Sequence, residues 1–387
     1  MLARWAVAAW LFAAASLAQK SPAPDKRIQL TPEPAAPSGS ERWDVQFLYD
    51  KNDSILELVD LKFSSPQRGI AAGTLMDKGR RKFTALVTRD GGAKWDFVPL
   101  EDEPISLFLL DDAHGWLVSR KGLWQTDESG RHWRRVWNRR GLARVWFTSA
   151  SRGFAIGAPK AVYETSDGGK TWRNVAAAGA LEAKPETTSF EAISFATPNV
   201  GLIAGVSRPL HRLDPLEPPW INPRSLELRR QMPNLVHVLQ TADGGKTWRP
   251  DTVSIFGWIT SLSMAPDGRS LALIEFFDLF EVPSEVHAID WKTTRSTLAF
   301  RRPDRSVTDV LVLANGPAWL AAIETGGRLY HTPVPGKLHM LVSDDLRQWR
   351  ETEVDYRASG NRAVLASAGR DHVWVATNTG MILKLRP

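Results

Sequence analysis

An eight-residue polar turn that ends in tryptophan recurs along the chain and constrains its fold more than any other feature. The copies read TRDGGAKW (88–95), TDESGRHW (126–133), TSDGGKTW (165–172), TADGGKTW (241–248) and VSDDLRQW (342–349). Their tryptophans are separated by 38, 39, 76 and 101 residues, and the two longer gaps leave room for an insertion and for a degenerate copy. A motif that returns at a nearly fixed period predicts a repeat architecture.

A second pattern fixes the number of repeats. Seven segments each hold two apolar runs separated by a short turn: LVDLKFSSPQRGIAAG, ISLFLLDDAHGWLVS, LARVWFTSASRGFAIG, FEAISFATPNVGLIAG, ITSLSMAPDGRSLALI, VTDVLVLANGPAWLAAI and RAVLASAGRDHVWVAT. Each predicts two strands, and the tryptophan turn joins two more. Four strands in about 40 residues are typical of a propeller blade. We therefore predict an all-β, seven-bladed β-propeller over residues 42–387, closed into a ring by an N-terminal strand at WDVQFLYD (43–50).

The composition of the turn explains its structural role. Its aspartates are expected to accept hydrogen bonds from nearby backbone amides, and its glycines permit positive φ. The tryptophan is expected to fold back into the gap between two blades, where a large ring buries much apolar area. The residues concerned are Asp90, Asp167, Asp243 and Asp344 and the tryptophans Trp95, Trp133, Trp172, Trp248 and Trp349. Glu128 replaces the aspartate in the second copy and the fifth blade has only AIDWKTT, so these two turns are predicted to be less regular.

This turn resembles the Asp-box, or bacterial neuraminidase, repeat, and the seven-blade phasing extends the resemblance over nearly all of residues 43–387. Similar repeats occur in sialidases, other secreted glycoside hydrolases, sortilin-type receptors and the photosystem II assembly and stability factor family. The chain looks most like the assembly-factor branch, and that resemblance implies a binding scaffold with a basic patch. It implies the fold more specifically than any function, since one fold hosts many functions.

The N-terminus predicts export. Residues 1–18 combine Arg4, an apolar stretch and a small-residue ending, as in a secretory signal peptide. Residues 19–41 are rich in Pro, Ser and Ala and predict a tether. No later stretch is long and apolar enough to predict a membrane span. The chain has no cysteine, which excludes disulfides, thiolate metal sites and thiol nucleophiles. We expect a monomer in the periplasm or outside the cell.

Arginines collect in the segments predicted to join the second and third strands of each blade or to link neighbouring blades. Such residues would converge on one face of the ring and attract anionic groups. The candidates are Arg80, Arg81, Arg120, Arg139, Arg140, Arg208, Arg212, Arg229, Arg230, Arg301 and Arg302. An insertion in the fourth blade, residues 206–234, adds Trp220 beside several of these arginines. Each arginine taken singly is also consistent with an ordinary solvated side chain.

Features of an enzyme are weak in the sequence. The arginine signature of sialidases is absent, and the best pair of carboxylates for glycoside hydrolysis is Glu275 and Glu324, which end the second strands of adjacent blades. No histidines occur at metal-ligand spacing and no glycine-rich phosphate loop is present. We expect no metal, no cofactor and no nucleic-acid partner.

Three functions are consistent with these observations. The first is an exported, non-enzymatic scaffold that binds a protein or an anionic polymer through its arginine-rich face. The alternative is a secreted glycoside hydrolase that acts on a polysaccharide. The third is an adhesion module in which the propeller presents the insertion at 206–234.

Overall fold

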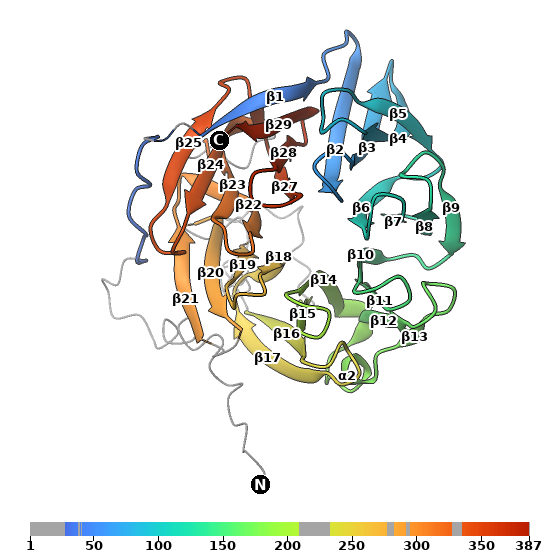
Figure 1. Cartoon of the computed structure of the whole chain (residues 1–387). Helices are drawn as coiled ribbons and strands as arrows, with labels where there is room; N and C mark the ends of the chain where they lie inside the picture. The colour runs from blue at the N-terminus through green and yellow to red at the C-terminus, as the bar shows by residue number, and fades with distance from the viewer. Residues whose placement is uncertain are drawn as a thin grey trace, which may run out of the picture.

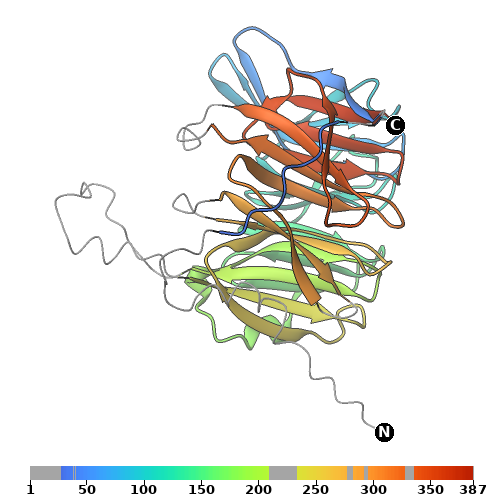
Figure 2. The same cartoon turned by 90° about the vertical axis from the view of Figure 1, so that its left-hand side faces the viewer.

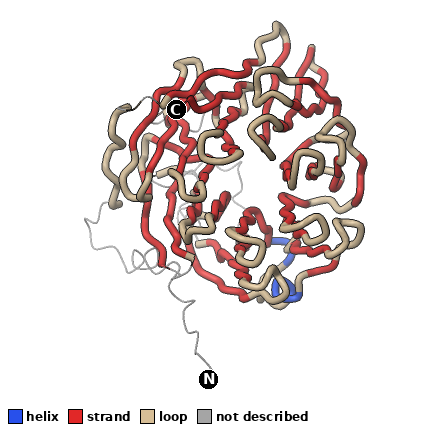
Figure 3. Tube along the Cα trace, in the orientation of Figure 1, coloured by secondary structure: helices blue, strands red, loops and turns tan. Residues whose placement is uncertain are grey.

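The chain folds into a ring of seven blades (Figure 1). The first strands of the blades surround a central channel. The computed structural model describes residues 28–37, 39, 41–208, 233–276, 282–291, 295–326 and 335–386. Within these ranges the chain is almost entirely strand, and the short α-helix α2 (Ala176–Gly179) and the 3₁₀ turn Pro185–Thr187 lie in one link between blades (Figure 3). The all-β, seven-bladed prediction is therefore confirmed.

Each blade is an antiparallel sheet whose first strand lines the channel and whose fourth lies at the rim. In chain order the blades are β2 (Ser54–Phe63), β3 (Gly69–Asp77), β4 (Arg80–Thr88) and β5 (Asp96–Leu100); β6 (Pro104–Leu109), β7 (Gly115–Ser119), β8 (Gly122–Thr126) and β9 (Arg134–Trp137); β10 (Leu142–Phe147), β11 (Gly153–Gly157), β12 (Ala161–Thr165) and β13 (Arg173–Asn174); β14 (Thr188–Phe195), β15 (Gly201–Ser207), β16 (Asn234–Thr241) and β17 (Arg249–Ile255); β18 (Trp258–Met264), β19 (Ser270–Glu275), β20 (Ser284–Asp290) and β21 (Arg295–Arg301); β22 (Arg305–Val312), β23 (Ala318–Glu324), β24 (Gly336–Ser343) and β25 (Arg350–Val354); and β27 (Ala363–Ser367), β28 (Val373–Thr377), β29 (Met381–Arg386) and β1 (Arg42–Leu48). A two-residue strand, β26 (Ser359–Gly360), pairs with the start of β24.

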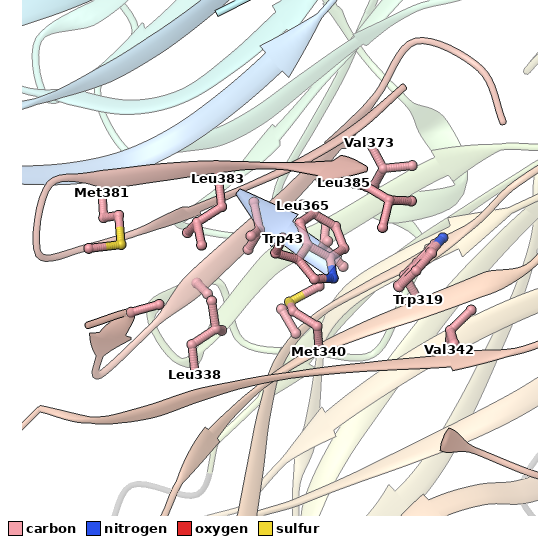
Figure 4. Packing of buried hydrophobic residues seen from close by; sticks show 14 of the residues in the cluster. Trp43, Trp319, Leu338, Met340, Val342, Leu365, Val373, Met381, Leu383 and Leu385 are labelled. Atoms are coloured by element: carbon pink, nitrogen blue, oxygen red, sulfur yellow. The ribbon is translucent and has the colours of Figure 1, made fainter. Parts of the chain in front are cut away.

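The N-terminal strand closes the ring as predicted. β1 pairs antiparallel with β29, with Val45 opposite Leu383, and supplies the fourth strand of the seventh blade. Its first two residues also pair in parallel with β25 of the sixth blade. Trp43 of β1 inserts between these two blades, meets Trp319 edge to face at 5.3 Å and donates from its indole to the hydroxyl of Thr352 (Figure 4). Closure thus combines strand pairing with a buried aromatic anchor.

The first strands are irregular, and buried aspartates in two of them tie neighbouring blades together. The register shifts in the first strand of each of blades one to six, as a β-bulge does when it redirects a side chain. In blade one, the buried carboxylate of Asp60 accepts a hydrogen bond from the N–H of Leu61, the next residue of the same strand. It also accepts one from the N–H of Leu107 in blade two. In blade six, Asp309 binds the N–H groups of Val310 and of Leu365 in blade seven in the same way.

Antiparallel pairing assigns every connection to one of two faces, which Figure 2 shows in profile. We call the face that carries the connections between second and third strands and the links between blades the loop face. The opposite face, here the turn face, carries the first-to-second-strand turns and the tryptophan turns. The sequence predicted the tryptophan turns and the arginine-bearing connections on opposite faces. The strand pairing places them so.

The tryptophan turns are built by a threonine and an aspartate two residues apart. In the turn of the third blade, Thr165 accepts from the N–H of Gly169, while Asp167 accepts from both the N–H and the hydroxyl of Thr171. The fourth blade repeats this arrangement with Asp243 and Thr247, and in the first blade Asp90 accepts from the N–H of Lys94, which has no hydroxyl to add a second bond. Gly168 and Gly169 have φ of +77° and +90°, a region that favours glycine.

Two copies of the turn depart from this pattern. In the second blade, Thr126 keeps its bond to the N–H of Gly130, but Glu128 lies beside His132 at 3.4 Å. In the sixth blade the residue that binds the turn amides is Asp345 rather than Asp344, because the strand ends at Ser343 and the turn is one residue shorter. The sequence alignment on Trp349 therefore predicted Asp344, one position too early, as the turn aspartate. Part of the fifth turn lies outside the described residues.

The turn tryptophans pack between blades beside a second, unexpected aromatic layer. Trp116 of β7 stacks on Phe147 of the next blade at 3.7 Å, and Trp172 meets that ring edge to face at 6.1 Å. Blades three and four repeat the arrangement with Phe154, Phe195 and Trp248, and blades seven and one repeat it with Trp374, Phe63 and Trp95. Trp133 and Trp349 pack in the corresponding gaps between blades.

Part of the segment expected to be a tether lies against the rim. Residues 28–37 cross the outer side of the fifth and sixth blades (Figure 2). Thr31 exchanges hydrogen bonds with the backbone of Arg301, and Ala35 bonds to the backbone of Trp349 and Glu351. We call residues 28–37 the strap. The signal peptide predicted for residues 1–18 lies outside the described residues, and in the described part of the chain no helix has the length and apolar character needed to cross a membrane.

Candidate functional site

The central channel is a hollow with a volume of about 900 Å³. First strands from all seven blades form its wall, and the ends of several second strands add to its opening on the loop face. The wall is mixed in character, since apolar side chains such as Phe108 and Leu311 alternate with serines and charged groups. A volume of this size is sufficient for a peptide segment or a small molecule.

Charged side chains gather where the channel opens on the loop face. We call this group the channel mouth; its residues are Arg144, Glu191, Arg208, Trp258, Glu275 and Arg362. The guanidinium of Arg208 lies 4.8 Å from the ring centre of Trp258 and 3.1 Å from a carboxylate oxygen of Glu191. The Nε of Arg144 donates to the backbone carbonyl of Glu191. Three guanidiniums and two carboxylates thus share one opening, and Arg362 is exposed to solvent.

Glu275 is the most perturbed acid of the channel mouth. Burial raises the pKa of its carboxyl above the ordinary value, against the opposing influence of Arg362 and a hydrogen bond from Thr260. Glu324, its predicted catalytic partner, is half exposed and lies 3.6 Å from His339 of β24. It does not line the channel. The structure therefore places Glu275, but not Glu324, in the wall of the channel.

The predicted loop-face arginines of blades one to three are largely exposed. Arg81 and Arg120 come from neighbouring blades and share one carboxylate, Glu103, at 2.8 and 2.7 Å. Arg139 lies 5.5 Å from the ring centre of Tyr163. Arg80 and Arg140 are exposed. These residues lie in or next to loop-face connections and do not line the channel.

Arg301 and Arg302 do not fit the predicted binding face. Arg301 pairs with buried Glu285 at 2.6 Å and donates to the carbonyl of Gln29 in the strap. Arg302 pairs with Glu33 of the strap and with Asp304. Both guanidiniums are thus engaged by carboxylates, and both also contact the strap.

Four predicted binding residues of the fourth-blade insertion, Arg212, Trp220, Arg229 and Arg230, lie outside the described residues. Only Arg208, at the base of that insertion, is placed, and it lies in the channel mouth. The sequence analysis missed Arg144, Arg362 and Trp258. Arg144 and Trp258 lie in first strands and Arg362 directly precedes one, so their convergence depends on the ring geometry. Among the described residues no group of three or more potential metal-binding side chains occurs.

These features define the class: a seven-bladed β-propeller with a channel of mixed polar and apolar character that opens on a charged loop face. No family model matches the chain, and no curated protein matches it. Among solved structures it is similar to YCF48 bound to a D1 peptide, with 15% identity, a TM-score of 0.57 and coverage of 91% of this chain and 96% of that chain. YCF48 from Cyanidioschyzon merolae matches at 17% identity and a TM-score of 0.55, covering 89% and 98%.

A third similar structure is the β-propeller domain of the Trilobed protease from Pyrococcus furiosus. It matches at 10% identity with a TM-score of 0.50, over 85% of this chain and 94% of that domain. At such identities these likenesses show the fold alone, and function has to be argued from the site.

Proposed function

We propose that this protein is an exported, non-enzymatic scaffold that binds a protein partner through its loop face, with the channel mouth at the centre of the contact. The observation that carries the proposal is the convergence of Arg144, Arg208 and Arg362, from three different blades, on one wide opening. Arginine suits such a surface because its planar fork pairs with carboxylates and stacks on aromatic rings, as Arg208 does on Trp258.

A protein partner is favoured by two further considerations. The similar YCF48 structure contains a bound D1 peptide, so a propeller of this shape is compatible with peptide binding. The rim arginines Arg81, Arg120 and Arg140 extend the positive surface well beyond the channel, which suits a partner larger than a small molecule. Export is proposed from the signal-like residues 1–18. Membership of the Asp-box repeats is proposed from the repeated threonine and aspartate bonds of the turns.

The test compares two triple variants that remove the same charge from opposite faces. R144A/R208A/R362A removes three cations from the channel mouth, and K94A/K170A/K246A removes three exposed cations from the tryptophan turns. Each purified chain is immobilised and exposed to an envelope extract of the source organism at low salt, and bound proteins are identified by mass spectrometry.

We expect a partner captured by the native chain to be lost with the channel-mouth variant and retained with the turn variant. Capture should also weaken at about 0.5 M salt, where charges are screened within a few ångströms. Equal capture by both variants would contradict the proposal. Melting temperatures of the two variants show whether a loss reflects unfolding.

A further inference from the structure

Blade one is taller than its neighbour on the loop face. β2, β3 and β4 contain ten, nine and nine residues, whereas β7 and β8 of blade two contain five each. The side of blade one that faces blade two is buried where the blades overlap, as Ala72 and Ala85 show. Beyond the shorter strands of blade two, the same side of blade one is less covered, although Glu103 of the link bridges Arg81 there to Arg120 of blade two.

The less covered part carries apolar side chains. Ile55 lies opposite Met76, and Met76 lies opposite Arg81, so the three share one side of the sheet. It is the side that contains Ala72 and Ala85, because alternate residues of a strand point the same way. Ile55 is 65% exposed, an unusual fraction for an isoleucine within a strand. We call residues 54–57 and 74–83 the overhang.

The overhang also has an open backbone edge. β5 pairs with β4 only from Phe83 to Val87. Toward the hairpin tip, residues Arg80 to Lys82 pair with β3 on one side, and no strand of the described chain pairs with them on the other. Unpaired N–H and C=O groups on such an edge are a template for another strand. The open edge continues the line of β5 onto the loop face.

The positive charge of this edge favours an acidic partner strand. The hairpin from Asp77 to Lys82 holds four cations and one carboxylate. Lys82 pairs with Asp77 at 2.6 Å, and Arg81 and Arg120 share Glu103. Two guanidiniums on one carboxylate leave unneutralised positive charge. A second copy of this chain would bring the same cations opposite one another, which destabilises a strand pair; an acidic strand would neutralise them.

We propose that the open edge of β4 receives an extended acidic segment of a partner protein as an added antiparallel or parallel strand. Backbone hydrogen bonds to residues 80–82 provide affinity, and acidic side chains pair with Arg80, Arg81 and Lys82. The apolar surface of Ile55 and Met76 is then covered by the rest of the partner. This inference rests on the proposed function for its assumption that the partner is a protein, but it concerns a site separate from the channel mouth.

The edge can be tested with defined peptides and one reporter side chain. The probes are the acetylated, amidated hexapeptide Val-Glu-Val-Glu-Val-Glu, its Lys-for-Glu counterpart, and a Glu form N-methylated at alternate residues so that it cannot extend a sheet. The readout is the methyl NMR signal of Met76 on the overhang, with buried Met340 and Met381 as internal references. The variant R80E/K82E reverses the edge charge and leaves the Arg81–Glu103 pair intact, and K94E/K170E is its matched control on the turn face.

We expect the Glu peptide to shift the Met76 signal saturably and to bind about tenfold more tightly than the Lys peptide. The N-methylated peptide and the R80E/K82E chain should show no saturable shift, whereas K94E/K170E should behave as the native chain. An unshifted Met76 signal, equal binding of the Lys peptide, or undiminished binding of the N-methylated peptide would overturn the added-strand proposal. The capture experiment with the channel-mouth variant tests the proposed function independently of these peptides. A negative peptide result would therefore overturn the added strand and leave the proposed function standing.

Discussion

The indole of Trp374 in β28 stacks on the ring of Phe63 in β2, with ring centres 3.5 Å apart and planes 3° apart. Trp374 is fully buried, and its N–H donates to the carbonyl of Gly91 in the first tryptophan turn. One side chain near the C-terminus thus contacts both the first strand and the turn of the first blade. Together with the pairing of β1 and β29, it holds the two ends of the ring together.

Replacing Trp374 should therefore weaken the whole ring. Trp374→Ala removes a stacked pair and leaves a cavity between the first and last blades, so we expect a loss of about 3 to 5 kcal/mol in the free energy of unfolding. Urea unfolding followed by tryptophan fluorescence measures it. Tyr356→Ala, at an 85% exposed side chain, serves as control and should change stability by less than about 0.5 kcal/mol. Similar values for the two variants would contradict the role of Trp374 in closure.

Asp60→Ala should destabilise the contact between the first and second blades. The buried carboxylate accepts from the N–H of Leu61 and of Leu107, and removing it leaves both donors without that acceptor. We expect a cost of about 1 to 3 kcal/mol, measured by urea unfolding. Asp371→Ala, at an exposed site on the turn face of blade seven, should have little effect. Equal effects of the two substitutions would show that Asp60 is not an interblade acceptor.

The stabilising contribution of the turn aspartates should depend on pH in the acidic range. The hydroxyl and N–H of Thr247 lower the pKa of Asp243 to about 2, from an ordinary 3.8. Because the folded pKa is the lower one, the stabilising contribution of Asp243 is complete above about pH 4 and is lost as the pH falls through about 2. Carboxyl NMR titration should give this midpoint. Thr247→Ala should move it toward 3.8, and an unchanged midpoint in that variant would show that Thr247 is not the cause.

Removal of the strap should speed hydrogen exchange at the backbone that it contacts. The N–H of Glu351 donates to the carbonyl of Ala35 at 2.8 Å, on the outer edge of β25. A chain that begins at residue 38 lacks this acceptor, so the Glu351 amide should exchange at least about tenfold faster. The amide of Val375, in the buried strand β28, is the control and should be unaffected. Unchanged exchange at Glu351 would mean that the strap does not occupy this edge in solution.

The sequence predicted the architecture because the repeated turn is a local signal. Thr165, Asp167, Gly168 and Trp172 lie within eight residues, and their hydrogen bonds and φ angles depend on little outside the turn. The apolar strand pairs are equally local, and counting them fixed seven blades. The position of β1 followed from the missing strand of the last repeat.

The site was predicted less well because it depends on contacts between distant segments. Arg301 and Arg302 are chemically suitable for a binding face, but the strap, whose Glu33 is far away in sequence, engages Arg302. Arg144 lies beside a bulge in β10, and a change of register by one residue decides whether a side chain points into the channel. Asp344 was predicted to bind the turn amides in place of Asp345, because the tryptophan turn of the sixth blade is one residue shorter than the others.

Hydrogen-exchange mass spectrometry on the complex with the captured partner is the most direct test of loop-face binding. We predict slower exchange in the loop-face segments 139–144 and 187–191 when the partner is bound, and no change in the tryptophan turns 88–95 and 165–172. Protection confined to those turns, or no protection of the segments around the channel mouth, would contradict the account.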